Sequence, residues 1–130
     1  TTLINDLKKL KSLSILQPDK GVYNAAKKHA ADQNTHEWKL LHTGSDGSSP
    51  WDRIKLFSPT MKFGNENIAG RHGYGNNAPR EIVLQLLIDG GIPGYGHRYN
   101  LLDPQWTYAA CRVENYKGTW WWIQEFSVKR

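Results

Sequence analysis

Leucine and isoleucine side chains recur at helical spacing at the start of the chain. Within residues 2–16 they fall on one stripe, formed by Leu3, Ile4, Leu7, Leu10 and Leu13. This spacing predicts an amphipathic helix that Pro18 stops. Asp19 caps a second predicted helix, whose inward face carries Val22, Tyr23, Ala26, His29, Ala30 and Gln33. A histidine on such a stripe is more often a satisfied core residue than a ligand.

The most apolar segment of the chain follows Pro79. Its apolar side chains are Ile82, Val83, Leu84, Leu86, Leu87 and Ile88. They cover nearly the whole circumference of a helix that runs to Asp89, so this helix is predicted to be the most buried one. The pair Gly90-Gly91 ends it.

The last third of the chain alternates as β-strands do. Residues 107–113 and 119–128 are predicted strands, joined by a hairpin turn at residues 115–118. The second strand is apolar on both faces, with Trp120, Trp122 and Phe126 on one and Trp121 and Ile123 on the other. Such a strand needs cover on both faces. The pattern therefore predicts an α+β fold, an α-β-α sandwich with a central antiparallel sheet covered by helices on both faces.

Glycine, serine, aspartate and proline are concentrated in residues 42–50, which predicts a loop. Pro50 suits the first turn of a short helix that Ser49 caps. Residues 64–70, bounded by glycines, are predicted to form a short strand, and residues 93–96 a second irregular stretch.

Composition narrows the class of protein. With 130 residues, 38% of them apolar and 12% aromatic, the chain is predicted to form one globular domain over residues 1–130 and not a disordered one. No apolar run approaches the ~20 residues that span a bilayer. The net charge of +5 is spread along the chain, which indicates solvated helix faces and no nucleic-acid partner. The single cysteine excludes an internal disulfide, and we expect a monomer.

Several catalytic motifs are absent. His36-Glu37 begins like the zinc-protease motif HExxH, but Leu40 stands where the second histidine is needed. The chain has no GxSxG elbow and no Walker loop.

Four ionisable residues lie at the edges of predicted buried elements, namely His42, Glu66, Asp89 and His97. Such positions are candidates for a shared site. Two imidazoles and two carboxylates suit zinc or another divalent cation, and they also suit general acid–base chemistry. Taken singly, each is more often a helix cap or a structural hydrogen-bonding group.

Four sequence blocks carry a family resemblance. They read His42-Thr43-Gly44-Ser45-Asp46-Gly47-Ser48 with Arg53 following, Asn65-Glu66-Asn67-Ile68-Ala69, Leu86-Leu87-Ile88-Asp89 leading into Pro93, and Gly96-His97-Arg98-Tyr99-Asn100-Leu101-Leu102. The second resembles GENIA and the fourth GHRxNLL, two motifs of the CAP superfamily. This superfamily comprises cysteine-rich secretory proteins, antigen 5 and pathogenesis-related class 1 proteins, also called SCP-like extracellular domains. The chain resembles its compact bacterial branch.

The resemblance implies an α-β-α sandwich with an open cleft lined by a His/acid tetrad. His42, Glu66 and His97 match three positions of this tetrad. Asp89 takes the fourth, usually a glutamate, with Glu81 as the alternative. In many members of the family the two histidines bind a divalent cation, often zinc. The residues expected to support the tetrad are Ser45, Asp46, Arg53, Asn67 and Arg98.

The expected function is that of a secreted or cell-surface CAP domain. Its cleft would bind a divalent cation and an unknown ligand, a lipid or a peptide, without robust catalysis. One alternative is a metal-assisted hydrolase with Glu66 as base. Another is a lipid or carbohydrate binder that uses the tryptophan cluster at residues 120–122, although alternation in a strand favours core packing for these side chains. The disulfides of the eukaryotic members and their sterol-binding signature are absent.

Overall fold

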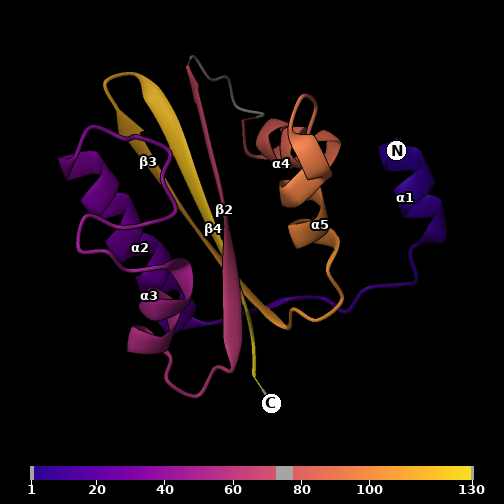
Figure 1. Ribbon diagram of the computed structural model, residues 1–130, viewed down its shortest axis with the longest axis horizontal. Helices are drawn as coiled ribbons and strands as arrows, with labels where there is room; N and C mark the ends of the chain where they lie inside the picture. The colour runs from indigo at the N-terminus through magenta and orange to yellow at the C-terminus, as the bar shows by residue number, and fades with distance from the viewer. Residues whose placement is uncertain (1, 73–77, 130) are drawn as a thin grey trace.

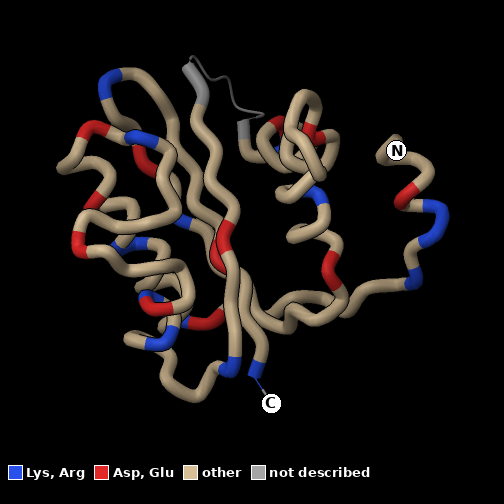
Figure 2. Tube along the Cα trace, in the orientation of Figure 1, with Lys and Arg blue, Asp and Glu red and all other residues tan. Residues whose placement is uncertain are grey.

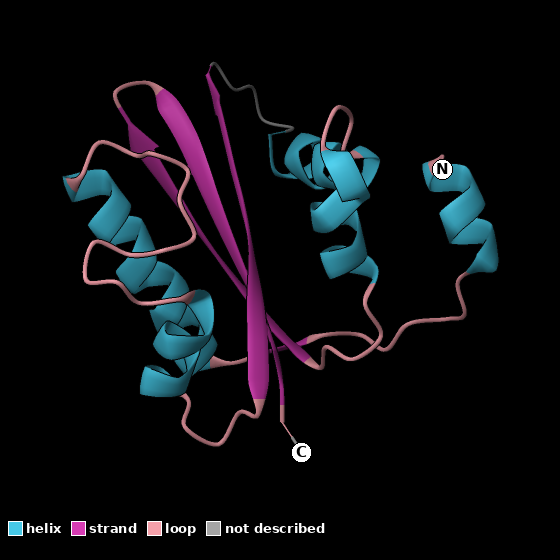
Figure 3. Cartoon of the chain, in the orientation of Figure 1, coloured by secondary structure: helices cyan, strands magenta, loops and turns pink. Residues whose placement is uncertain are grey.

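The computed structural model describes residues 2–72 and 78–129 of the chain. Figures 1 and 3 show the order of its helices and strands. The elements are α1 (Leu3–Lys9), β1 (Gln17–Pro18), α2 (Lys20–Thr35), α3 (Pro50–Phe57), β2 (Phe63–His72), α4 (Ala78–Ile88), the short 3-10 helix η1 (Pro93–Tyr95), α5 (Gly96–Leu102), β3 (Tyr108–Tyr116) and β4 (Thr119–Val128).

The strands form one sheet in the order β1-β3-β4-β2. The three long strands are antiparallel, whereas β1 adds a two-residue parallel pairing on β3. Helices α2 and α3 cover one face of the sheet, and α4 and α5 cover the other (Figure 1). The predicted α-β-α sandwich is therefore confirmed. The parallel pairing of β1 was not predicted, because two residues carry no periodic signal.

The central strand β4 supplies core side chains to both layers. Ile123 packs with Ala26 and Ala30 of α2, whereas Trp122 packs with Ile82 and Leu86 of α4. The alternation predicted for this strand is confirmed, and it explains why helices are needed on both faces.

The tryptophans of β4 differ in their surroundings. Trp122 is buried, and Trp121 stacks on Trp38 with ring centroids 4.9 Å apart. Gly70 lies under the Trp121 ring, since a Cβ there would come within 2.4 Å of it. Trp120 is more than one-third exposed. Core packing thus accounts for Trp121 and Trp122 but leaves Trp120 at the surface.

The prediction that α4 is the most buried helix is wrong. Ile82 and Leu86 are buried, but Val83, Leu84 and Ile88 are exposed. The reason is that α4 contacts the sheet through the side that carries Ile82 and Leu86, which pack against Trp122 of β4. The layer of α4 and α5 lies on the opposite face of the sheet from α2 (Figure 1). Helix α2 instead buries six residues, namely Val22, Ala25, Ala26, His29, Ala30 and Gln33.

The first helix is shorter than predicted. It ends at Lys9, and the backbone of Leu10 is already extended. No residue of α1 is buried, and a helix this short has little stability without packing. Beyond it the chain extends toward β1, where the Gln17 N–H donates to Thr107 O at 2.9 Å. The sequence pattern could not show this pairing with a residue 90 positions away.

The irregular stretch predicted at residues 93–96 is instead the 3-10 helix η1 followed by the first residue of α5. The predicted helix caps are confirmed. The Asp19 side chain caps α2, and Ser49 begins α3 with a reciprocal capping box that involves Asp52. Basic and acidic residues are interspersed over both helical layers (Figure 2). Within residues 2–72 and 78–129, no helix has the length and apolar character needed to cross a membrane.

Candidate functional site

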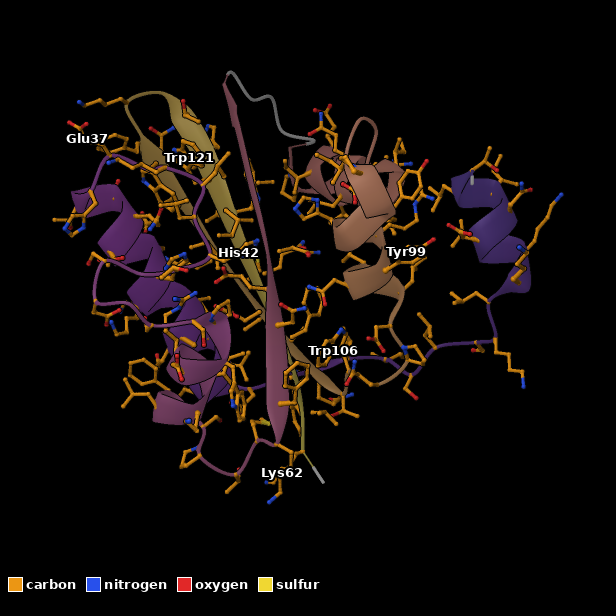
Figure 4. All side chains as sticks on the ribbon, in the orientation of Figure 1. Glu37, His42, Lys62, Tyr99, Trp106 and Trp121 are labelled. Carbon is orange, nitrogen blue, oxygen red and sulfur yellow. The ribbon has the colours of Figure 1, made fainter. Side chains whose placement is uncertain are left out.

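The first half of the site joins the loop after α2 to strand β2. Nδ1 of His42 donates to Oε1 of Glu66 at 2.8 Å. A carboxylate can only accept, so Nδ1 carries the ring proton and Nε2 of neutral His42 keeps a free lone pair. The Glu66 side chain is buried, whereas His42 is half-exposed beside β2 (Figure 4). The loop thus presents Nε2 of His42 outward from a buried acid.

Arg53 holds this half together from α3. Its Nη2 donates to Oε2 of Glu66 at 2.8 Å and to the carbonyl of His42 at 2.9 Å. Its Nη1 donates to the carbonyl of Ser48 at 2.9 Å. Since Arg53 is fully buried, these contacts fix both ends of the loop at residues 42–48 to the same guanidinium.

A second carboxyl group adjoins Glu66. Glu125 of β4 is the register partner of Glu66, and both side chains are buried. Neither oxygen of Glu125 accepts a hydrogen bond from a described residue. Burial raises the pKa of Glu125 well above its ordinary value, and the charge of Glu66 raises it further. Glu125 is therefore a neutral acid that donates its proton to Glu66.

Glu66 itself is ionised. Burial alone raises its pKa, but hydrogen bonds from His42 and Glu125 and the charge of Arg53 lower it, and the net pKa lies below its ordinary value. His29 of α2 completes the cluster, with Nε2 3.8 Å from Oε1 of Glu66. Nε2 of His29 donates to the carbonyl of Leu41 at 2.7 Å, and burial lowers the His29 pKa. It is a neutral core residue, as its inward position predicts.

The second half of the site lies where α4 turns into α5. Nδ1 of His97 donates to Oδ1 of Asp89 at 2.8 Å, and the His97 backbone N–H donates to Oδ2 at 2.9 Å. Asp89 has a left-handed backbone with φ of 51°, and Gly91, with φ of 77°, completes the reversal. The buried Asp89 thus fixes His97 through both ring and backbone, and Nε2 of His97 is again the free ring nitrogen.

Arg98 and Asn67 fix this turn to the rest of the fold. Arg98 donates to the carbonyls of Leu87 and Ile88 at the end of α4 and to Asp6 of α1. Nδ2 of Asn67 on β2 donates to the carbonyl of His97 at 3.2 Å. Asn67 directly follows Glu66, so consecutive β2 residues hold the two histidine segments from opposite faces of the strand.

The other expected site residues lie elsewhere. Ser45 bonds to the carboxylate of Asp32, and Asp46 pairs with Lys28 at 2.8 Å. Both fasten the loop to α2 without touching the four tetrad residues. Glu81 is exposed in the first turn of α4, and the acid that bonds to His97 is Asp89.

A cavity of about 450 Å³ opens beside His97. It is lined by residues 68–70 of β2, by the second half of α4 and by the turn from Asp89 to His97. We call it the β2–α4 cleft. His42 does not line it.

The donor set suits a cation held by histidine. Each ring is oriented by a carboxylate on Nδ1, the arrangement that metal-binding histidines use. All four oxygens of Glu66 and Asp89 already accept hydrogen bonds. In the part of the chain that the structure describes, no three or more His, Cys, Asp or Glu side chains gather as a metal site. The available ligands are therefore two imidazole nitrogens.

Glu125 is the site residue that the sequence reasoning missed. The sequence does contain a sign of its role, because Glu125 lies two residues after Ile123 and so shares the inward face of β4. A charged side chain at such a position requires a partner in the core.

Known proteins resemble this chain over most of its length. An uncharacterized protein of Bacillus subtilis (strain 168), YkwD, is 27% identical over 127 residues, which are 98% of this chain and 45% of that protein. This chain thus spans less than half of that relative. An extracellular protein containing a SCP domain from Bacillus anthracis str. Ames superposes with a TM-score of 0.67 at 25% identity, over 97% of this chain and 37% of that one.

A third similarity concerns the fold alone. An outer surface protein from Borrelia burgdorferi superposes with a TM-score of 0.71 at 17% identity, over 97% of this chain and 84% of that one. The sequence model of the cysteine-rich secretory protein family, CAP, matches residues 1–126. This match spans nearly the whole sequence and agrees with the sandwich fold, so the chain belongs to the CAP family.

Proposed function

We propose that this CAP domain is a secreted or cell-surface binding module that holds a divalent cation, such as zinc, on Nε2 of His42 and His97. One observation carries the proposal. Both histidines direct Nδ1 to a buried carboxylate, which leaves Nε2 of each ring free for a metal. A bound cation would supply positive charge that attracts an anionic or carbonyl group of a ligand.

The proposed site is a weak one. Two neutral ligands bind zinc less firmly than the three or four protein ligands of catalytic and structural sites. Metal binding also requires neutral imidazole, so zinc affinity falls when acid protonates the ring nitrogens.

Calorimetric titration with zinc tests the site. The wild-type chain is compared with the double variant His42→Ala/His97→Ala. His36→Ala is the matched control, because His36 is also paired with an aspartate, Asp32, but lies on the exposed end of α2. We expect zinc binding in the wild type and in the control and its loss in the double variant. Equal zinc uptake by all three proteins would remove the proposed site.

The geometry of Glu66 argues against efficient hydrolysis. A general base must accept a proton readily near neutral pH. Glu66 is instead buried, bound by Arg53 and ionised with a lowered pKa. We expect no zinc-dependent turnover of peptide or ester substrates above background. Turnover that Glu66→Gln abolishes, with fold and zinc uptake intact, would establish the metal-assisted hydrolase instead.

The relatives support an extracellular location. The B. anthracis neighbour is described as extracellular and the B. burgdorferi neighbour as an outer surface protein. Detection of the full-length protein in the culture medium or on intact cells, but not in the cytoplasmic fraction, tests this part of the proposal.

A further inference from the structure

Strand β2 has one edge that no strand of the sheet covers. It is the last strand in the order β1-β3-β4-β2, and within the described ranges 2–72 and 78–129 it pairs only with β4. The carbonyl of Ser127 on β4 accepts from Thr107 and so points toward β3. The direction of the backbone N–H and C=O groups alternates along a strand. Those of Phe126 and Gln124 therefore point toward β2, where their register partners are Asn65 and Asn67.

The β2 residues that alternate with Asn65 and Asn67 direct their backbone N–H and C=O groups away from β4. The Glu66 N–H bonds to the Asn65 side chain and not to β4. Ile68 and Gly70, two and four positions further, share this direction. Among the described residues, no hydrogen bond reaches the outward N–H or C=O groups of Ile68 and Gly70. With respect to the described residues, these donors and acceptors are available to a ligand.

The β2–α4 cleft opens along this same edge. Residues 68–70 line it from β2. Ile88 and Ile92, both exposed although large and apolar, line it from α4 and the turn that follows. His97 also lines the cleft. The cleft therefore combines a row of backbone groups, an apolar wall and one imidazole.

We propose that the β2–α4 cleft binds an extended peptide, which adds to the sheet as a further strand beside β2. A peptide in β conformation repeats its own N–H and C=O groups every two residues, about 6.8 Å apart, and so matches Ile68 and Gly70. Alternate side chains of the peptide contact Ile88 and Ile92. A lipid chain would fill the apolar wall but leave the backbone groups of β2 unpaired.

This inference deepens the proposed binding function by naming the class of ligand. It does not depend on the cation, because the backbone groups of β2 are present without it. All peptide titrations are therefore run with a chelator present, and zinc is titrated separately. Loss of one activity then leaves the other measurable.

Amide hydrogen exchange in the full chain provides the test. The probes are blocked heptapeptides that alternate valine and threonine between terminal lysines, added at millimolar concentration. In the free protein, the amides of Ile68 and Gly70 should exchange faster than those of Asn67 and Ala69, which pair with β4. Peptide should slow Ile68 and Gly70 at least tenfold and leave Asn67 and Ala69 unchanged. Unaltered exchange at both outward amides would overturn the proposal.

Two controls identify the mode of binding. N-methylation of the peptide on the alternate residues that face β2 should weaken binding at least tenfold, whereas N-methylation on the other edge should not. Ile88→Ser should weaken binding, and Leu84→Ser, exposed on α4 but outside the cleft, should leave it unchanged. If neither N-methylation of the peptide nor Ile88→Ser changes the peptide affinity, strand addition is contradicted. If phospholipid micelles slow amide exchange at the residues that line the cleft, and the peptides do not slow exchange at Ile68, the cleft binds lipid instead.

Discussion

Glu66 and Glu125 lie opposite each other in the β2–β4 ladder, and both carboxyl groups are buried on the face of the sheet that α2 and α3 cover. Only one guanidinium, that of Arg53, contacts the pair among the described residues. Two adjacent buried carboxylates cannot both stay ionised beside a single positive charge. The pair therefore carries one proton, and it resides on Glu125.

Replacing Glu125 by glutamine should make stability less dependent on pH. In the wild type, the unfolded chain releases the Glu125 proton above pH 4.5, whereas the folded chain keeps it because its pKa is raised. Stability therefore falls with rising pH in this window, by at most about 1.4 kcal/mol per pH unit. Glutamine cannot titrate and still donates to Glu66, so Glu125→Gln should gain relative stability as pH rises. Urea unfolding from about pH 4.5 to about pH 8 measures this difference.

The matched control for this experiment is Glu37→Gln, which removes the charge of an exposed glutamate. Its stability should run parallel to that of the wild type across the same pH range. If Glu125→Gln also runs parallel to the wild type, Glu125 is ionised in the fold and its assignment as the neutral acid fails.

Arg53→Met should strongly destabilise the fold. The substitution keeps much of the side-chain volume but leaves ionised Glu66 without its guanidinium, and breaking a buried ion pair costs about 3–5 kcal/mol. The exposed Arg80→Met should change the free energy of unfolding by less than about 0.5 kcal/mol. The double variant Arg53→Met/Glu66→Gln should recover part of the loss, and chemical denaturation measures all three. A loss below about 1 kcal/mol for Arg53→Met would show that water already solvates Glu66.

Leu86→Ala and Val83→Ala should separate the two sides of α4. Leu86 packs against Trp122, so its truncation should cost about 2–5 kcal/mol. Val83 is exposed, and its truncation should cost less than about 0.5 kcal/mol. Thermal or urea unfolding measures both. Similar losses at both positions would mean that α4 buries its whole circumference after all.

Asp89→Asn should weaken zinc binding while it preserves the turn. Asparagine tolerates the left-handed backbone at this position, but it lacks the negative charge of the carboxylate that orients the His97 ring. Loss of such a partner lowers metal affinity about 10–100-fold. Asp46→Asn is the control, because Asp46 pairs with Lys28 away from the tetrad. Calorimetry should show weaker zinc binding for Asp89→Asn only. Equal zinc affinities for both variants would show that Asp89 does not support zinc binding by His97.

Local patterns in the sequence predicted the sandwich well. Alternation of Trp122 and Ile123 in β4 was enough to require two helical layers, and the caps at Asp19 and Ser49 marked the helix starts. These signals are local, since each depends on residues within a few positions. The predictions of the length of α1 and of the burial of Val83 were wrong for the opposite reason. They depend on which distant elements supply contacts, and periodicity says nothing of these.

The site was only partly predictable for the same reason. Its four ionisable residues could be named from their positions next to glycines and loop ends. That His42 meets Glu66 across 24 residues, and that Glu125 joins them from a strand 59 residues further on, follows from the register of β2 on β4. Spacing in a sequence does not contain that register.

Because Glu66 and Asn67 occupy consecutive positions of β2, the arrangement of the site depends on one register of β2 on β4. If β2 slipped by one residue along β4, every side chain would change face. Glu66 would leave Arg53 and enter the α5 layer, and Asn67 would lose His97 in the same step. A misaligned sheet would therefore lose the β2 contacts of both histidine segments in one step. The correct register of β2 on β4 is the condition for placing the two halves of the site relative to each other.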